Sequence, residues 1–176
     1  MRLVVRLGLS LAALVAFLFG VGLLLPRDHV ATSSIDLSQP PDSVWAVIRD
    51  PEALLGHWPE LASVRREVTP DGQEAWNETV DGFAMRLLLT EEQPPHRLVM
   101  TVDSKEGDAF GGKWVYRIEP TATGSRLIVS EDGWIANPFF RLMGNVMGLH
   151  GSIDGYLRAV GTRFGEDPTP VHVDDA

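Results

Sequence analysis

Hydrophobic residues follow three different patterns along this chain, and the first is a continuous run. Leu7 to Leu25 is a run of nineteen residues with one hydroxyl, on Ser10, and no charge. An α-helix of that length rises about 1.5 Å per residue, roughly 28 Å in all, which nearly matches a hydrocarbon core of about 30 Å. We therefore predict that residues 1–26 form an N-terminal transmembrane anchor and that a soluble domain follows.

The middle of the chain has the pattern of β-strands separated by turns. Ala31–Leu37 alternates and is rich in β-formers, which predicts a first strand. Pro41 and Asp42 suit the first turn of a helix, and a second short helix is predicted over residues 51–58. Turn signals such as Asp81-Gly82 then separate six further strands. These strands are predicted at 61–68, 74–80, 83–91, 96–103, 110–119 and 125–134.

The last third carries apolar residues at alternating spacings of four and three, the period of one helix face. Asn137 and Pro138 suit its N-cap and first position, so we predict one long helix whose stripe faces the sheet. The stripe consists of Phe139, Met143, Val146, His150, Ile153, Leu157, Val160 and Phe164. Four glycines lie on roughly the opposite face of the predicted helix. Either the helix tolerates glycine there, or another segment or chain approaches this face closely. These glycines are Gly144, Gly148, Gly151 and Gly155.

The order of these elements predicts an α+β domain. A curved antiparallel sheet of seven strands must cover its apolar face, and the long C-terminal helix is the available cover. A space between a curved sheet and a single helix is a candidate cavity for an apolar ligand. Residues 166–176 are acidic, contain two prolines and lack periodicity, so they are predicted to be a disordered tail.

Composition limits the partners and the chemistry. Residues 27–176 contain 13 basic and 24 acidic residues, a formal charge of −11, which argues against nucleic acid and against adsorption to anionic headgroups. The sequence has no Cys, which excludes disulfides, thiolate nucleophiles and thiolate metal sites. It also has no nucleophile elbow, phosphate loop, dinucleotide fingerprint or zinc signature, so we expect neither a cofactor nor a metal.

Charges beside the apolar run predict its orientation. Arg2 and Arg6 precede the run and Arg27 follows it, which favours a cytoplasmic N-terminus and a domain on the outer, periplasmic or extracellular, side. A cleaved signal peptide is the alternative, but small residues are missing from the positions that cleavage requires. Small residues four apart are either ordinary in a membrane span or a surface for a homodimer. They are Gly8, Ala12, Ala16 and Gly20.

Three segments of the soluble part resemble one superfamily. They are Ile35–Trp45, Asp50–Pro59 and the last hairpin, Tyr116–Leu127. With the element order, they resemble the SRPBCC superfamily, the helix-grip fold of START lipid-transfer domains, polyketide cyclases and aromatases. The resemblance covers residues 31–165 and implies a cavity that binds hydrophobic ligands. It implies no catalytic motif, because the superfamily shares none.

Aromatic and apolar residues expected to face the cavity are candidates for ligand binding. His150 is the only polar residue of the helix stripe, so it is either a catalytic base or carbonyl-binding group, or a core histidine paired with the sheet. The candidates are Trp58, Trp76, Trp114, Tyr116, Trp134, Met143, Val146, His150 and Leu157. We therefore expect binding of a small hydrophobic or lipid-like molecule at a membrane surface. The alternatives are a cyclase- or aromatase-type enzyme and a protein-interaction module.

Other polar residues of the strands and of the short helical region give weaker signals. Glu78 and Arg86 are expected to face each other across a hairpin, either inside the domain, where they would orient a polar head group, or on the outside as an ordinary surface ion pair, which we favour. Glu131 and Asp132 are adjacent in a strand, so they should point to opposite faces and share no proton. The resemblance to the superfamily implies that His57, in the short helical region, lies at the cavity entrance, and the alternative is a position in solvent.

Overall fold

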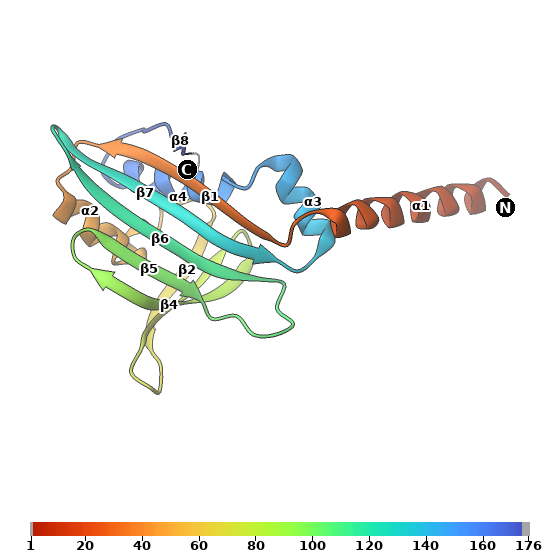
Figure 1. Cartoon of the computed structure of the whole chain (residues 1–176), viewed down its shortest axis with the longest axis horizontal. Coiled ribbons are helices and arrows are strands. Elements are labelled where there is room, and N and C mark those ends of the chain that lie inside the picture. The colour runs from red at the N-terminus through yellow and green to blue at the C-terminus, as the bar shows by residue number, and fades with distance from the viewer. Residues whose placement is uncertain (1, 174–176) are drawn as a thin grey trace.

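The computed structural model describes residues 2–173 and contains an α+β domain with a helix projecting from one end (Figure 1). This confirms the predicted fold class and the position of each predicted strand. The helices are α1 (Arg2–Leu24), α2 (Pro41–Ile48), the 3₁₀ helix η1 (Pro51–Leu54), α3 (Pro138–Met147) and α4 (Gly151–Arg163). The strands are β1 (Asp28–Leu37), β2 (Leu61–Val68), β3 (Glu74–Val80), β4 (Phe83–Gln93), β5 (Arg97–Val102), β6 (Phe110–Thr121), β7 (Gly124–Ile135) and β8 (Val171–His172).

One antiparallel sheet contains all eight strands, in the order β2-β3-β4-β5-β6-β7-β1-β8. Strands β2 to β7 are joined in sequence as hairpins. Strand β1, the first in the chain, pairs with β7, the last of these hairpin strands. The turn between β3 and β4 is Asp81-Gly82, and both residues have positive φ, 51° and 78°, as a type I′ turn requires. This two-residue turn sets the register, so that Val80 pairs with Phe83 and Glu78 with Met85.

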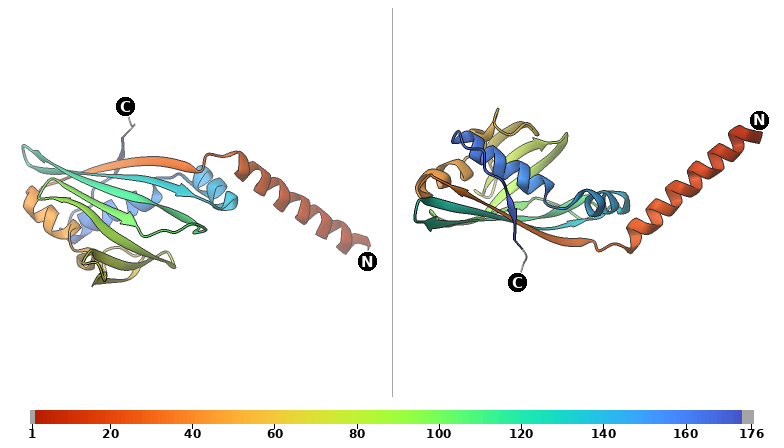
Figure 2. Two further views of the ribbon diagram at one scale, coloured as in Figure 1. Left: turned by 60° about the horizontal axis from the view of Figure 1, so that its bottom comes forward. Right: turned by 90° about the horizontal axis from the view of Figure 1, so that it is seen from above.

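Helices α2 and α4 lie on one face of the curved sheet (Figure 2). In α4, the side chains of Ile153, Leu157 and Val160 are fully buried. Together with Ile35 and Leu127 of the sheet, they belong to the main hydrophobic core. The second half of the predicted apolar stripe therefore covers the sheet as expected.

The prediction of one long C-terminal helix is wrong, because the chain breaks between α3 and α4. Gly148 ends α3 with φ 93°, a conformation open to glycine and unfavourable for L-residues. The two halves of the stripe consequently face different surroundings: Met143 is 41% and Val146 78% exposed, whereas Ile153 is buried. After the break, α3 no longer continues along the line of α4, and it packs mainly against the end of α1.

The four glycines of this region lie in different surroundings. Gly155 lies against another segment, since a Cβ there would be 3.4 Å from Nε1 of Trp58. A Cβ at Gly144 would be 3.0 Å from Leu149, whereas Gly151 has open space around its Cα. Close approach of the Leu149 side chain therefore explains Gly144, a positive φ explains Gly148, and a Cβ at Gly155 would make ordinary contact with Trp58.

The segment after α4 differs from the predicted disordered tail over residues 166–173. Strand β8 pairs with β1, and the Val173 backbone N–H donates to the carbonyl of Thr32 over 2.9 Å. Before it, the Glu166 carboxylate accepts a hydrogen bond of 2.7 Å from the Ser38 hydroxyl, and this contact lowers the pKa of Glu166. The sheet thus gains an eighth strand. Residues 174–176 lie outside the described part of the chain.

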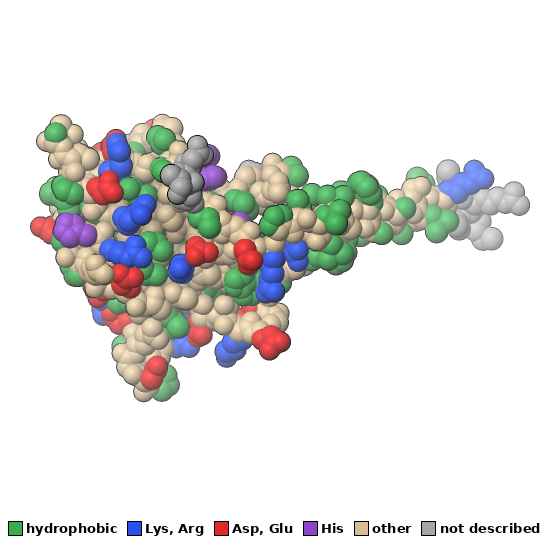
Figure 3. Space-filling view, viewed as in Figure 1, with side chains coloured by type: hydrophobic (Ala, Val, Ile, Leu, Met, Phe, Trp, Pro, Cys, Tyr) green, Lys and Arg blue, Asp and Glu red, His purple; other side chains and the backbone are tan. Residues whose placement is uncertain are grey.

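Helix α1 extends away from the domain with its apolar side chains exposed (Figure 3). By length and composition alone, residues 6–24 could cross a membrane, and a signal sequence would have the same properties. The last turn of α1 contacts α3, where Nη1 of Arg141 donates to the Leu25 carbonyl over 3.2 Å. The orientation of the helix and its homodimer face stay predictions.

Candidate functional site

Two adjoining compartments lie between the sheet and the helical segments α3 and α4. The outer compartment has a volume of about 380 Å³ and the inner one about 80 Å³. Residues from four strands and α4 line both compartments, so the two spaces share a wall. These residues are Val80, Met85, Val102, Trp114 and Ser152.

The outer compartment opens at the end of the domain from which α1 projects. Phenylalanines from three elements form its rim: Phe83 follows the β3–β4 turn, Phe110 begins β6 and Phe140 belongs to α3. The Phe83 ring packs edge-to-face against both others, with centroids 6.4 Å and 6.2 Å away. Trp134 also lines this compartment, and the guanidinium of Arg27 lies 4.5 Å from its ring centroid.

A small polar group lies on one wall of the outer compartment. Nε2 of His29 is 3.6 Å from a carboxylate oxygen of Glu131, and the Ser152 hydroxyl donates to the same carboxylate over 3.1 Å. The neighbouring Asp132 instead pairs with Lys113 over 3.2 Å and is exposed. Glu131 and Asp132 therefore point to opposite faces of β7, as predicted.

The inner compartment is surrounded by aromatic rings that meet at Tyr156 of α4. The ring centroid of Tyr156 lies 5.5 Å from that of Trp58, 5.7 Å from that of Trp114 and 5.5 Å from that of Tyr116. Burial raises the pKa of Tyr116 and of Tyr156 above the usual value near 10, so both hydroxyls stay protonated at physiological pH. The two hydroxyls are also hydrogen-bonded to each other.

The Glu78 carboxyl is the acidic group of the inner compartment. Its side chain is 8% exposed, and within residues 2–173 it forms neither an ion pair nor a hydrogen bond. Burial disfavours the carboxylate and raises the pKa of Glu78 to about 7. The site therefore holds one buried carboxyl group that changes its charge near neutral pH.

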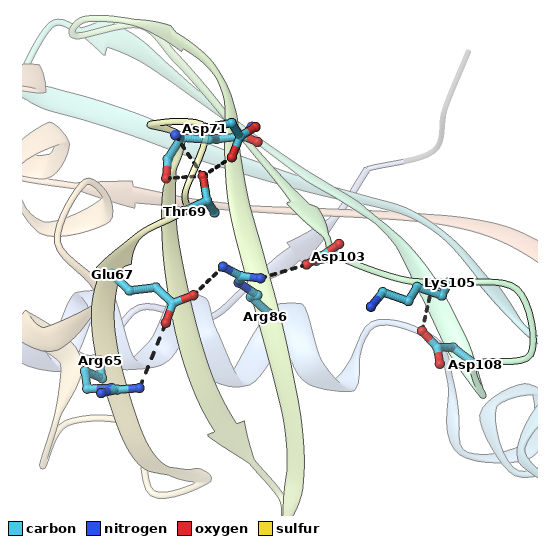
Figure 4. Close-up of polar contacts among 9 residues, drawn as sticks. Arg65, Glu67, Thr69, Asp71, Arg86, Asp103, Lys105 and Asp108 are labelled. Atoms are coloured by element: carbon cyan, nitrogen blue, oxygen red, sulfur yellow. Dashed lines mark hydrogen bonds and ion pairs between the residues drawn. The ribbon is translucent and has the colours of Figure 1, made fainter.

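The prediction of a surface ion pair between Glu78 and Arg86 is wrong. The turn register places Asn77 opposite Arg86, so Glu78 and Arg86 lie on opposite faces of the sheet. Arg86 pairs outside with Glu67, and with Asp103 over 3.2 Å (Figure 4). Strand alternation puts Glu78 on the core face with Trp76, which could have revealed its position from the sequence.

Four of the nine predicted ligand-binding residues line a compartment. Trp58 and Tyr116 line the inner one, Trp134 the outer one, and Trp114 both. Trp76 is buried elsewhere in the core, with the Arg49 guanidinium 5.3 Å from its ring centroid.

The remaining four lie away from both compartments. Leu157 is fully buried in the core, while Met143 and Val146 are exposed on α3. His150 lies in the break between the helices, where its ring stacks on His172 at 3.8 Å. None of these four side chains therefore lines a compartment: the break at Gly148 removes Met143, Val146 and His150 from the sheet, and Leu157 packs into the core.

Other candidates take little part in the site. His57 is half-buried and lines neither compartment. Across residues 2–173, His, Cys, Asp and Glu side chains form no group of three or more that could hold a metal ion. The helix periodicity does not indicate Tyr156 and Ser152, which line the inner compartment, because both lie beside the helix stripe and not on it.

The domain that follows α1 matches a known family. A family model described as polyketide cyclase / dehydrase and lipid transport matches residues 28–164. The chain belongs to this family. No curated protein matches the chain.

Solved structures similar to this member of the family share its fold at low sequence identity. A protein from Mesorhizobium loti is 16% identical with a TM-score of 0.59, covering 78% of this chain and 97% of that one. A conserved protein from Geobacillus kaustophilus is 16% identical with a TM-score of 0.60, covering 82% and 100%. The di-domain ARO/CYC StfQ from the steffimycin biosynthetic pathway is 14% identical with a TM-score of 0.60, covering 76% of this chain and 50% of that one.

Proposed function

We propose that this protein binds a small hydrophobic or lipid-like ligand in the cavity between its sheet and its C-terminal helices, next to a membrane. The observation that carries the proposal is the pair of adjoining compartments. The outer one has a volume of about 380 Å³, within the usual range of about 300–1,000 Å³ for ligand pockets. Its walls are mainly apolar and aromatic, which suits an alkyl chain or a ring system.

The position of the opening supports access from a bilayer. If α1 spans a membrane, α3 lies at the membrane interface because it packs against the last turn of α1. Phe139 and Phe140 are 46% and 42% exposed on α3, and Phe83 is 51% exposed across the opening. Exposed aromatic and apolar side chains beside a membrane helix favour contact with acyl chains. A ligand could therefore enter the outer compartment without crossing water.

The test is native mass spectrometry of the full-length protein in dodecyl maltoside micelles with n-dodecanol as the probe. We expect one bound dodecanol per chain. Val102→Trp should abolish this binding, because Val102 lines both compartments and a larger side chain would fill their junction. Val68→Trp is the matched control, since Val68 is 64% exposed on the edge strand β2.

Two outcomes would contradict the proposal. One is the absence of dodecanol on the wild-type chain, and the other is equal binding by the wild type and a folded Val102→Trp variant. Thermal melting monitors the fold of each variant. Val80→Phe narrows the same junction from β3, and it replaces Val102→Trp in the test if that variant does not fold.

A second candidate function is acid–base chemistry on a hydrophobic carbonyl substrate, favoured by one observation. Glu78 faces the inner compartment with a pKa of about 7, which suits proton transfer at neutral pH, whereas His150 lies outside both compartments. The test is hydrogen–deuterium exchange beside the carbonyl of 2-tridecanone in D₂O, followed by NMR. Exchange catalysed by the wild type and lost in Glu78→Gln would support an enzyme, and equal exchange by both would exclude this role of Glu78.

A further inference from the structure

The inner compartment contains one carboxyl group and no basic side chain. Of the residues that line it, Glu78 from β3, Tyr116 from β6 and Tyr156 from α4 are titratable. Ser152 of α4 is neutral. The lining side chains from α2, η1, β2, β4 and β5 are all apolar: they are Ile48, Pro51, Leu54, Leu61, Met85, Leu87, Met100 and Val102. A carboxylate formed here would have no counter-ion from these walls.

Aromatic rings surround the space that Glu78 faces. Trp58, Trp114, Tyr116 and Tyr156 all line it, with neighbouring centroids 5.5–6.2 Å apart. Aromatic faces attract cations within about 6 Å of the ring centroid, and a cation among several rings is favoured further when it is desolvated. The compartment volume of about 80 Å³ suits a head group of a few heavy atoms and is too small for a long chain.

We infer that the inner compartment binds the ammonium head group of an amphiphile, with Glu78 as its counter-ion and the rings of Trp58, Trp114 and Tyr156 as its walls. The inference rests on the proposed function, because the alkyl part of this ligand would occupy the outer compartment. A cation would compensate the buried carboxylate, which otherwise lacks a partner. The formal charge of −11 on residues 27–176 also favours the approach of a cation over that of an anion.

The protonation of Glu78 makes binding depend on pH in a defined direction. In the folded protein without a ligand, the pKa of the Glu78 carboxyl is about 7, so this group is mostly neutral at pH 5.5 and mostly ionised at pH 8. Both tyrosines stay neutral in this range. Four further titratable side chains line the outer compartment but not the inner one: His29, Asp81, Lys113 and Glu131. Affinity for an ammonium head should therefore rise with pH, while affinity for an uncharged head should change little.

Competition between three probes of equal chain length tests the inference: dodecyltrimethylammonium, n-dodecanol and dodecyl sulfate. Native mass spectrometry of the full-length protein in dodecyl maltoside micelles measures their relative occupancy. At pH 8 we expect about tenfold preference for the ammonium over the alcohol, with the sulfate weakest. At pH 5.5 this preference should fall severalfold. Glu78→Gln should lose the preference at pH 8 and still bind dodecanol.

Glu119→Gln is the matched control, because it removes the same charge from an exposed position on β6. It should keep the wild-type preference at both pH values. Equal binding of the ammonium and the alcohol at pH 8 would overturn the inference, and so would a preference that survives in Glu78→Gln. Binding of dodecanol alone would leave the proposed function standing, whereas no binding of any probe would overturn both. If Glu78→Gln does not fold, the pH dependence of the wild type decides.

Discussion

Pro138, the first residue of α3, packs directly against Gly22 in the last turn of α1. A Cβ at Gly22 would lie 2.0 Å from the Pro138 carbonyl oxygen, so the contact requires the absence of a side chain. This contact joins the apolar N-terminal helix to the helix that forms part of the cavity rim. Gly22 therefore contributes, together with the Arg141–Leu25 hydrogen bond, to the position of the opening relative to α1.

Substituting Gly22→Leu should separate α3 from α1. The added side chain cannot fit against the backbone of Pro138, so the amides of residues 139–147 should exchange faster in hydrogen–deuterium exchange of the micelle-bound protein. Gly20→Leu is the matched control, because a Cβ at Gly20 meets no atom within 4 Å. Equal exchange rates in the two variants would show that the contact does not hold α3 in place.

Stability should decrease with rising pH because of Glu78. Its pKa is raised from 4.5 to about 7 in the folded protein, so the folded state binds the proton more tightly than the unfolded state does. The free energy of unfolding should therefore fall between about pH 4.5 and pH 7, by about 3 kcal/mol for this group, and level off above that range. Urea denaturation at several pH values, followed by tryptophan fluorescence, measures the decline.

Glu78→Gln provides the decisive comparison for this decline. The amide has no charge to bury, so the part of the pH dependence between pH 5 and pH 8 that arises from Glu78 should disappear. Glu119→Gln, at an exposed position, should retain the wild-type decline. A decline of the same size in all three proteins would mean that Glu78 does not titrate in this range.

The break between α3 and α4 should be sensitive to a methyl group at Gly148. Its φ of 93° and ψ of 141° disfavour any residue with a Cβ, so Gly148→Ala should lower stability by about 1–3 kcal/mol. Gly151→Ala is the control, because Gly151 begins α4 and has open space around it. There the alanine should be neutral or slightly stabilising. Thermal melting that ranks the two variants in the opposite order would contradict this account of the break.

A larger side chain at Gly155 should change ligand binding through Trp58. A Cβ at Gly155 would already lie 3.4 Å from Nε1 of Trp58, so Gly155→Val should displace the indole from the inner compartment. Binding of dodecyltrimethylammonium should weaken severalfold in the native mass spectrometry assay, while Thr162→Val, at an exposed position of α4 that lines neither compartment, should bind like the wild type. Unchanged binding in a folded Gly155→Val variant would place Trp58 outside the ligand contacts.

Local patterns determined most of the architecture. The nineteen-residue apolar run, the strand alternation and the turn signals were sufficient for α1, for β1 to β7 and for the α+β class, because these features depend on residues near each other in sequence. The resemblance to the SRPBCC superfamily agrees with the match of residues 28–164 to the polyketide cyclase / dehydrase and lipid transport family. Four aromatic residues of the site were also found from the sequence.

The tertiary structure decided which side chains meet in the cavity. The spacing of the helix stripe continues unchanged across Gly148, so periodicity could not show that a positive φ turns α3 toward α1. Strand alternation places Glu78 on the core face, but only the packing of α4 on the sheet brings Tyr156 and the other rings around its carboxyl group. Pairing of β8 with β1 depends on an edge far away in sequence. Long-range pairing and backbone conformation at single residues leave no periodic trace, so only the folded chain brings the carboxyl group and the aromatic rings together.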